Sequence, residues 1–172
     1  LEAEIPRAKD LAERVEAQVG PKGVAPRIRK VAETNDREST ALIIAKELAA
    51  DLKEKEGVAF ALEQAVRTSL SILTEGVLVA PTEGVVKIST LENNNNTTCA
   101  SIYYAGPIRA AGGTVQALSV LIADVVRREL GLDSYIPTPA EIERYKEEIP
   151  LYKRAVNLQY VPSSDEIESI VT

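Results

Sequence analysis

The chain has 172 residues, with 26 acidic side chains against 20 lysines and arginines and a formal net charge of −6 at pH 7. A chain of this length buries roughly 70% of its unfolded surface without a metal or disulfide, which suits one domain or one domain with a small appendage. It contains no histidine and one cysteine, Cys99, which excludes an intrachain disulfide, a paired-histidine zinc site and any histidine-based nucleophile couple.

The cysteine usage favours a reducing, cytoplasmic setting. The longest apolar stretch, Val115–Val126, is interrupted by polar residues and is too short to span a bilayer, so we expect no membrane partner. The acidic balance argues against a surface that attracts nucleic acid as a whole, because long-range attraction to phosphate needs a basic face. The chain begins at Leu1 and lacks methionine, so we expect it to be an excerpt of a longer polypeptide.

Residues 1–76 predict a helical subdomain. Pro6 suits a first helical position, and Gly20-Pro21 suits a helix end. The run "TNDRES" predicts a turn that also caps the helix after it. The apolar spacing predicts four helices, from Pro6 to about Val19, from Pro26 onward, from about Ser39 to Lys53, and from about Val58 to Thr74.

The pattern changes near Gly76, and residues 77–172 predict an α+β subdomain. "VLVAPTEGVVKIS", residues 77–89, predicts a hairpin around a Pro-Thr-Glu-Gly turn. "ENNNN", residues 92–96, predicts a solvated loop without packing, and "TTCASIYY", residues 97–104, predicts a third strand. The expected fold class is therefore α+β, a helical N-terminal half followed by a small antiparallel sheet of about three strands packed with helices.

The last third of the chain predicts three more helices. The first runs from Thr114 to Leu130 and ends at Gly131, with an inward side expected to carry Leu118, Leu121, Ile122 and Val125 and an outward side with Arg127, Arg128 and Glu129. The other two start at capping boxes, formed by Thr138 with Glu141 and by Ser163 with Glu166.

The stretch "YYAGPIRAAGGT", residues 103–114, joins the third predicted strand to a helix. A glycine-rich turn at a helix start directs free backbone N–H groups and the positive helix end at one spot, which favours an anion. There Gly112 and Gly113 would let a ligand approach the backbone, Thr114 would cap the helix, and Arg109 would add a bidentate phosphate contact. The spacing matches neither a P-loop nor a Rossmann fingerprint, and the alternative is that these glycines only turn the chain.

A second candidate is the densest basic cluster in the chain, formed by Lys22, Arg27, Arg29 and Lys30. Such a cluster suits contact with a phosphate backbone, and the alternatives are a solvated face or a subunit contact. Tyr103 and Tyr104 either stack on bases or pack into the core, with at least one of them expected inside.

Several other side chains favour structural roles. Cys99 is expected to be a small buried hydrophobe. Asp124, beside an apolar stripe, favours an arginine partner over a catalytic role. The carboxylate pairs Glu147–Glu148 and Asp165–Glu166 are adjacent on helices and point about 100° apart, which argues against a metal site.

The long string "YYAGPIRAAGGTVQALSVLIADVVRRELGLDSYIPTPAEIERYKEEIPLY" resembles the N-terminal region of the large subunit of archaeal D-family DNA polymerase, also called DNA polymerase II. "EIPRAKDLAERVEAQVGPKGVAPRIR", "EQAVRTSLSILTEGVLVAPTEGV" and "LQYVPSSDEI" resemble the same region in the same order. The resemblance covers nearly the whole chain and is weakest in the asparagine run and in residues 31–58.

This resemblance implies a parent polypeptide that is the polymerising subunit of a two-subunit replicative enzyme. Magnesium at paired aspartates and zinc at cysteines would serve the parent, and a small partner subunit would carry the 3′–5′ exonuclease. No position in residues 1–172 matches those aspartate or cysteine motifs, so no catalytic residue, metal ligand or cofactor is expected in this chain.

The function expected from the resemblance is a non-catalytic module that supports the catalytic core, DNA contact and assembly. Its expected partners are the remainder of the large subunit, the small exonuclease subunit and primer-template DNA. The alternative is a self-association or subunit-docking module without direct DNA contact, in which the helical half, residues 6–75, pairs with a second copy to form a homo-oligomer.

Overall fold

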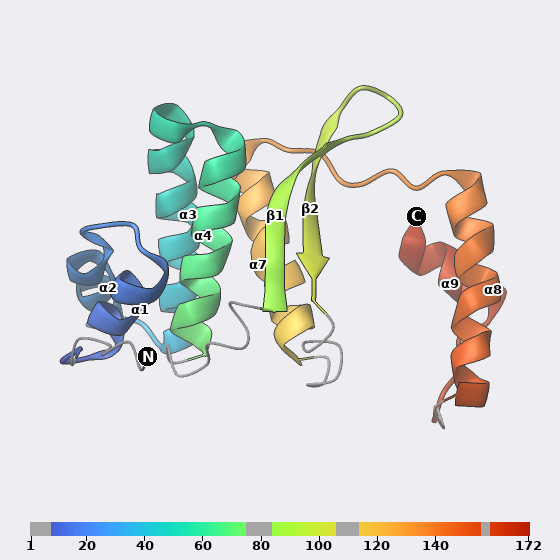
Figure 1. The fold of residues 1–172 in the computed structure, drawn as a ribbon, viewed down its shortest axis with the longest axis horizontal. Coiled ribbons are helices and arrows are strands. Elements are labelled where there is room, and N and C mark those ends of the chain that lie inside the picture. The colour runs from blue at the N-terminus through green and yellow to red at the C-terminus, as the bar shows by residue number, and fades with distance from the viewer. Residues whose placement is uncertain (1–7, 75–83, 106–113, 156–158) are drawn as a thin grey trace, which may run out of the picture. The chain divides into compact units, whose positions relative to one another are not determined.

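The computed structural model describes residues 8–74, 84–105, 114–155 and 159–172 (Figure 1). It divides into two compact units, Leu1–Ser134 and Tyr135–Thr172. The first unit contains α1 (Leu11–Val19), α2 (Val24–Ala32), α3 (Arg37–Glu56), α4 (Val58–Leu73), β1 (Val85–Glu92), β2 (Thr98–Tyr104) and α7 (Thr114–Leu130). The second contains α8 (Pro139–Ala155) and α9 (Ser164–Val171). The predicted α+β class is confirmed.

The first two helices do not start where the prolines predicted. Pro6 lies outside the described residues, and α1 begins at Leu11 because the Asp10 carboxylate accepts a hydrogen bond from the Glu13 N–H at 2.9 Å and so caps the helix. Helix α2 begins at Val24 rather than at Pro26. Pro26 lies in its first turn, where an N–H has no partner within the helix, so the proline is tolerated there.

Helices α3 and α4 form a helical hairpin that lies beside α7 (Figure 1). Asp36, from the predicted capping run, accepts from the Ser39 N–H at 2.7 Å and starts α3. Gly57 joins the two helices with a φ of 90°, a left-handed backbone conformation that suits glycine. Inside the pair, the buried Ser69 hydroxyl donates to the Ala41 carbonyl oxygen at 2.7 Å.

Strands β1 and β2 pair antiparallel, with Ile88 opposite Ile102. The described residues hold these two strands instead of three, and the first predicted strand lies in the undescribed segment 75–83. The prediction that the asparagine run does not pack is wrong for its first member. Asn93 is 5% exposed, and its amide donates to the Ser134 carbonyl oxygen and the Thr97 hydroxyl, each at 2.9 Å. The contact with Ser134 joins residues 41 positions apart, so the periodicity of the chain does not reveal it.

One apolar cluster holds the first unit together. The boundary predicted near Gly76 lies outside the described residues, and side chains from both sides of it share this cluster. Its largest fully buried members are Val15, Val24, Ile44, Leu48, Leu62, Val66, Leu70, Ile72, Val85, Ile122 and Val126.

Helix α7 has the predicted bounds but presents a different face to the core. Leu121, predicted inward, is 54% exposed, whereas the buried side carries Ser119, Ile122, Ala123, Val126 and Leu130. Ser119 lies inside because its hydroxyl pairs with that of Tyr104 at 2.7 Å. The sequence offers apolar residues on more than one side of this helix, so periodicity alone could not choose between them.

Both helices of the second unit start at the predicted capping boxes. The Thr138 N–H donates to the Glu141 carboxylate at 2.7 Å, and the Glu141 N–H donates back to the Thr138 hydroxyl at 3.2 Å. Ser163 and Glu166 make the same exchange at the start of α9. No helix among the described residues is both long and apolar enough to cross a membrane.

A substitution at Leu48 tests how much the packing of the helical hairpin contributes to stability, because this side chain is 1% exposed within the apolar cluster. Replacing Leu48 with Ala should lower the free energy of unfolding by about 2–5 kcal/mol, through lost apolar contact and the cavity left behind. Lys46→Ala, on the exposed side of the same helix, should change it by less than about 0.5 kcal/mol. Urea unfolding of the chain measures both, and equal effects would contradict the described packing.

Cys99 lies on β2 with 1% exposure, and burial raises the pKa of its thiol. The thiolate is the reactive form, so a disulfide reagent should modify the folded chain slowly and the urea-unfolded chain rapidly. A disulfide reagent that releases a coloured thiolate lets absorbance report the rate of modification in the folded and the unfolded chain. Rapid stoichiometric reaction of the folded chain would place Cys99 at the surface instead.

Candidate nucleic-acid interface

The four residues of the predicted basic cluster lie on or next to α2. Lys22 precedes the helix, and Arg27, Arg29 and Lys30 project from it. The helix buries Val24, Ala25 and Ile28, so its apolar side faces the rest of the unit and its charged side faces outward. The sequence therefore located a real surface cluster, and the structure adds which of its cations are already paired.

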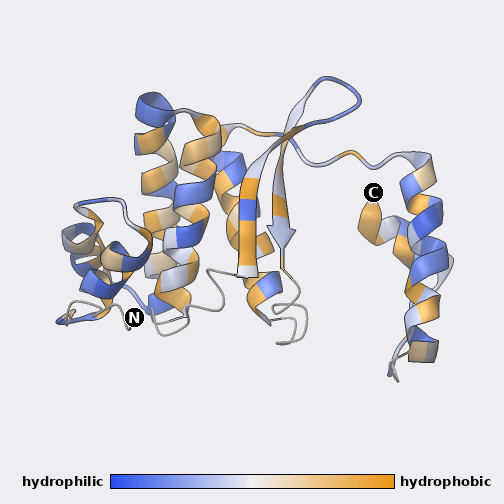
Figure 2. Ribbon diagram, in the orientation of Figure 1, coloured by the Kyte–Doolittle hydropathy of each residue, from blue (hydrophilic) through white to orange (hydrophobic). Residues whose placement is uncertain are grey.

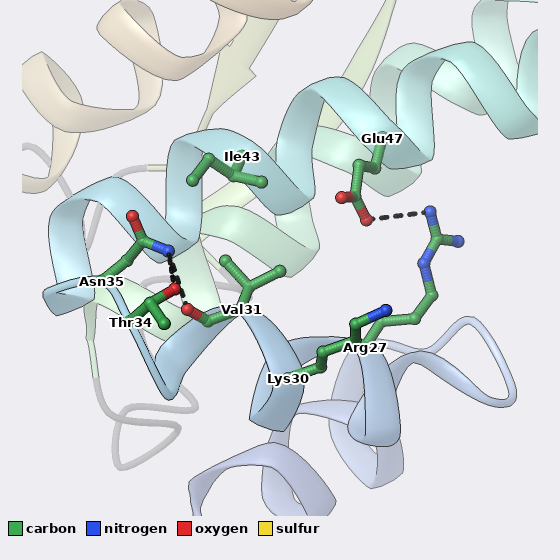
Figure 3. Close-up of a pocket in the computed structure, with 7 residues that line it drawn as sticks. All are labelled: Arg27, Lys30, Val31, Thr34, Asn35, Ile43 and Glu47. Carbon is green, nitrogen blue, oxygen red and sulfur yellow. Dashed lines mark hydrogen bonds and ion pairs between the residues drawn. The ribbon is translucent and has the colours of Figure 1, made fainter.

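Arg27 ties α2 to α3. One guanidinium nitrogen lies 3.1 Å from a Glu47 carboxylate oxygen (Figure 3), and another lies 3.4 Å from an Asp51 carboxylate oxygen. Residues four apart on a helix share a side, so both carboxylates of α3 meet the same arginine. All three side chains remain partly exposed. Because the two carboxylates offset the charge of Arg27, this arginine attracts a phosphate less strongly than an unpaired cation would.

Arg29 joins α2 to α1 through two carboxylates. Its Nε lies 2.7 Å from Asp10, and one Nη lies 2.8 Å from Glu13. The hydrogen bond from Arg29 is the largest cause that holds the pKa of Asp10 below its ordinary value. The pKa of Glu13 is lowered first by the Lys9 N–H and then by Arg29. These contacts make Arg29 a structural cation.

The N-terminus of α2 is occupied by a carboxylate of the chain itself. Glu16 accepts from the Ala25 N–H at 2.7 Å, and hydrogen bonds from Ala25 and Gly23 lower the pKa of Glu16. A helix N-terminus attracts anions through its free N–H groups, and here Glu16 fills that position. A phosphate would have to displace Glu16 to bind there.

Lys22 and Lys30 differ from the two arginines. Both are exposed, and neither has an ion-pair partner within the part of the chain that the structure describes. Lys30 lines a hollow of about 380 Å³ between α2 and α3 (Figure 3), together with Arg27, Val31, Thr34, Asn35, Ile43 and Glu47. Lys22 lines a second hollow, of about 440 Å³, with Glu13, Glu16 and Arg29 among its neighbours. These ammonium groups are the cations of the cluster that can meet a phosphate without breaking an ion pair.

The glycine-rich candidate is only partly described. Arg109, Gly112 and Gly113 lie outside the described residues, and Thr114 is the exposed first residue of α7. Whether these four residues form an anion site remains a prediction.

The two tyrosines at the end of β2 divide as expected. Tyr104 is half-buried, whereas Tyr103 is 47% exposed with the Lys87 ammonium 5.8 Å from its ring centroid. A cation near an aromatic ring of an exposed strand is a combination found where proteins bind single-stranded nucleic acid. Sequence reasoning missed Lys87, because only the strand register, in which it lies opposite Tyr103, brings the two together.

The remaining acidic candidates have structural partners or no neighbours of their kind. Asp124 pairs with Arg127 and Arg128, each at 2.7 Å, which confirms its predicted arginine partner. In the described ranges, no three carboxylate or cysteine side chains lie close enough together to hold a metal ion.

The fold and this surface define an α+β module that displays unpaired lysines beside structural ion pairs. The family model described as "DNA polymerase II large subunit DP2, N-terminal" matches residues 1–172. The chain belongs to this family and corresponds to the N-terminal region of its members.

Curated relatives agree with the family model. The chain is 53% identical over 169 residues to the DNA polymerase II large subunit of Methanococcoides burtonii, which covers 98% of this chain and 15% of that relative. It is 51% identical over 177 residues to that of Methanosphaera stadtmanae, covering 97% of the chain and 16% of the relative. It is 51% identical over 168 residues to the DNA polymerase II large subunit of Thermoplasma acidophilum, covering 98% of the chain and 15% of the relative. The chain thus spans about 15% of the length of these relatives.

The ion pairs of Arg29 generate a pH dependence. Asp10 has a lowered pKa in the folded chain against an ordinary value of 3.8, so its contribution to stability is present above that value and is lost as the pH falls through the folded pKa. Arg29→Ala should return the pKa of Asp10 toward 3.8 and remove part of this acid-range stabilisation. Titration of the Asp10 carboxyl by NMR measures the shift.

Lys30→Ala is the matched control, since it removes a cation from the same helix that does not contact Asp10. It should leave the pKa of Asp10 unchanged. An Asp10 titration that is the same in Arg29→Ala as in the wild type would show that this ion pair is absent in solution.

Proposed function

We propose that this chain is a non-catalytic N-terminal module of the large subunit of a replicative archaeal DNA polymerase. Family membership over residues 1–172 is the observation that carries the proposal. In the proposed assembly the complete polypeptide is a DNA-directed DNA polymerase that works with a small exonuclease subunit on primer-template DNA. The module supports the catalytic core and contributes contacts to the DNA backbone.

The side chains of the chain support a structural role over a chemical one. There is no histidine, and the only cysteine is buried on β2. Carboxylates with lowered pKa values serve the fold, since Asp10 pairs with Arg29, Glu16 caps α2, and Glu141 and Glu166 close capping boxes. A lowered carboxyl pKa with a structural cause does not mark a general acid.

The metals that the resemblance implies do not fit this chain. Zinc sites need about four cysteine or histidine ligands, and the chain has Cys99 alone. Magnesium at a polymerase centre needs converging carboxylates, and among the described residues no three carboxylate or cysteine side chains come together. We therefore assign magnesium and zinc to the remainder of the proposed polypeptide and derive no step through either.

The DNA contact is proposed to rest on cations that the fold leaves available. Lys22 lies exposed just before α2 and Lys30 lies on its exposed side, while Arg27 and Arg29 hold that helix to its neighbours. Contacts of lysine with phosphate position a protein on DNA without reading its sequence. Arg109, in the glycine-rich stretch of the sequence, is proposed as a further phosphate contact.

The self-association alternative has less support from the helical half. The apolar side chains of α1–α4 face the shared cluster. Among the described positions 8–74, Phe60 alone is a large hydrophobic side chain with strong exposure, which leaves little apolar surface for a second copy. Pairing of this half with a second copy stays a hypothesis.

The phosphate contacts are testable in the complete polymerase. Lys22→Ala combined with Lys30→Ala should weaken primer-template binding equally for all sequences, because phosphate contacts carry no sequence information. Each lost duplex contact should also reduce the slope of log affinity against log salt by roughly 0.9. Arg109→Ala, made separately, should act in the same direction. Binding measured by fluorescence anisotropy over a salt series gives both quantities.

Lys55→Ala is the matched control, since it removes one exposed lysine of α3 that is already paired with Asp51. It changes the net charge by the same amount as each single substitution and should leave the salt slope unchanged. If the Lys22/Lys30 and Arg109 variants both keep the wild-type salt slope, the proposed contacts of this module with the DNA backbone are wrong.

A further inference from the structure

The second compact unit displays large apolar side chains at its surface. Leu151 and Tyr152 on α8 are 56% and 60% exposed, and Tyr145 on the same helix is also exposed. In the second unit's described residues, 135–155 and 159–172, Ile167 is the one fully buried apolar side chain. This unit therefore shows more apolar surface than it buries in side chains of its own.

These exposed side chains form a continuous face of α8. Spacings of three, four and three residues bring Tyr145, Glu148, Tyr152 and Ala155 to one side of the helix, with Leu151 beside them. We name these five residues the α8 face. Four of them, Glu148, Leu151, Tyr152 and Ala155, line a hollow of about 250 Å³. Figure 2 shows hydrophobic colours toward the C-terminal end of α8 and hydrophilic colours nearer its middle.

Helix α9 lies against a different side of α8. Lys146 pairs with Glu168 of α9 at 2.6 Å, and residue 146 points about 160° away from the middle of the α8 face at 100° per residue. The contacts between the two helices therefore leave the α8 face uncovered.

The chemistry of the α8 face excludes a phosphate-bearing partner. Its one charged member, Glu148, is an anion and is paired with Arg144 at 2.6 Å. The face has no free cation, while tyrosine and leucine side chains dominate it. Aromatic and aliphatic residues with few charges are typical of the centre of an interface between protein surfaces.

The occupant of this face must be present whenever the unit is folded. The unit consists of residues 135–172. A chain shorter than about 40 residues usually needs a disulfide, a metal or a partner surface to stay folded, and this unit is below that length. Its two helices have sound caps, but caps contribute only about 1 kcal/mol each. A covalently attached segment satisfies this need best, because attachment gives it a high effective concentration at every dilution.

The relatives indicate which segment is available. The matched stretch is 15% of the Methanococcoides burtonii large subunit and corresponds to the N-terminal region of the family, so most of that polypeptide lies beyond it. We propose that the α8 face is the surface on which the continuation of the same polypeptide, beyond residue 172, packs. This inference rests on the proposed function only in that the chain is the N-terminal part of a longer large subunit.

A photo-cross-linking experiment on the complete large subunit identifies the occupant. Benzoylphenylalanine placed at position 152, in the middle of the α8 face, should form on irradiation a cross-link within the same chain. Mass spectrometry should map it to a peptide beyond residue 172, and mixing of heavy- and light-isotope chains should show no hybrid cross-links. The same amino acid at position 147, an exposed glutamate off the face, is the matched control and should give no such cross-link.

The outcomes separate the possible occupants. A cross-link between two copies, to the small subunit, or to any segment other than the continuation would overturn the proposal, as would the absence of any cross-link at position 152. Leu151→Asp should lower the melting temperature of the complete large subunit, whereas Ala50→Asp, which adds the same charge at an exposed site in the interior of α3, should change it far less.

Primer extension by the same wild-type preparation provides an independent readout. If extension fails while the cross-link to the continuation forms, the proposed polymerase function is wrong and the docking surface stands. If extension succeeds while the cross-link goes elsewhere, only the docking proposal is wrong.

Discussion

The packing of α3 against α4 is the contact on which the rest of the first unit depends. The two helices bury side chains against each other, and α7, α1 and β1 then pack on the pair. Apolar burial of this kind is the main favourable contribution to folding, and it involves residues far apart in the sequence. Because α2 is held to α3 by Arg27, the position of the candidate DNA-contacting lysines is also set by this helical pair.

The basic cluster on α2 shows how one surface can divide its cations between two tasks. Arg27 and Arg29 each reach two carboxylates, an arrangement that suits the planar, many-donor guanidinium. Lys22 and Lys30 carry compact charges on flexible chains and remain exposed. Exposed ion pairs contribute little stability individually, so the arginines add only modestly to the orientation of α2 that its buried apolar side chains set.

Local signals in the sequence predicted much of the fold. The capping boxes at Thr138 and Ser163 and the stop at Gly131 were correct because their chemistry involves residues only a few positions apart. Leu121 and Asn93 were misplaced because their surroundings come from distant segments. For the candidate site, the basic residues were visible as neighbours in sequence. Their carboxylate partners, up to 24 positions away, gave no signal at all.

The buried amide of Asn93 has a consequence for chemical ageing. Asparagine side chains lose ammonia over time and become carboxylates, a weakness that proteins of hot environments tend to avoid. At the exposed Asn94, Asn95 and Asn96 such a conversion only adds a charge in water. At Asn93 it would exchange a donor for an acceptor facing the Ser134 carbonyl oxygen, so that one small covalent lesion would remove one of the hydrogen bonds that join the hairpin to the segment that follows α7.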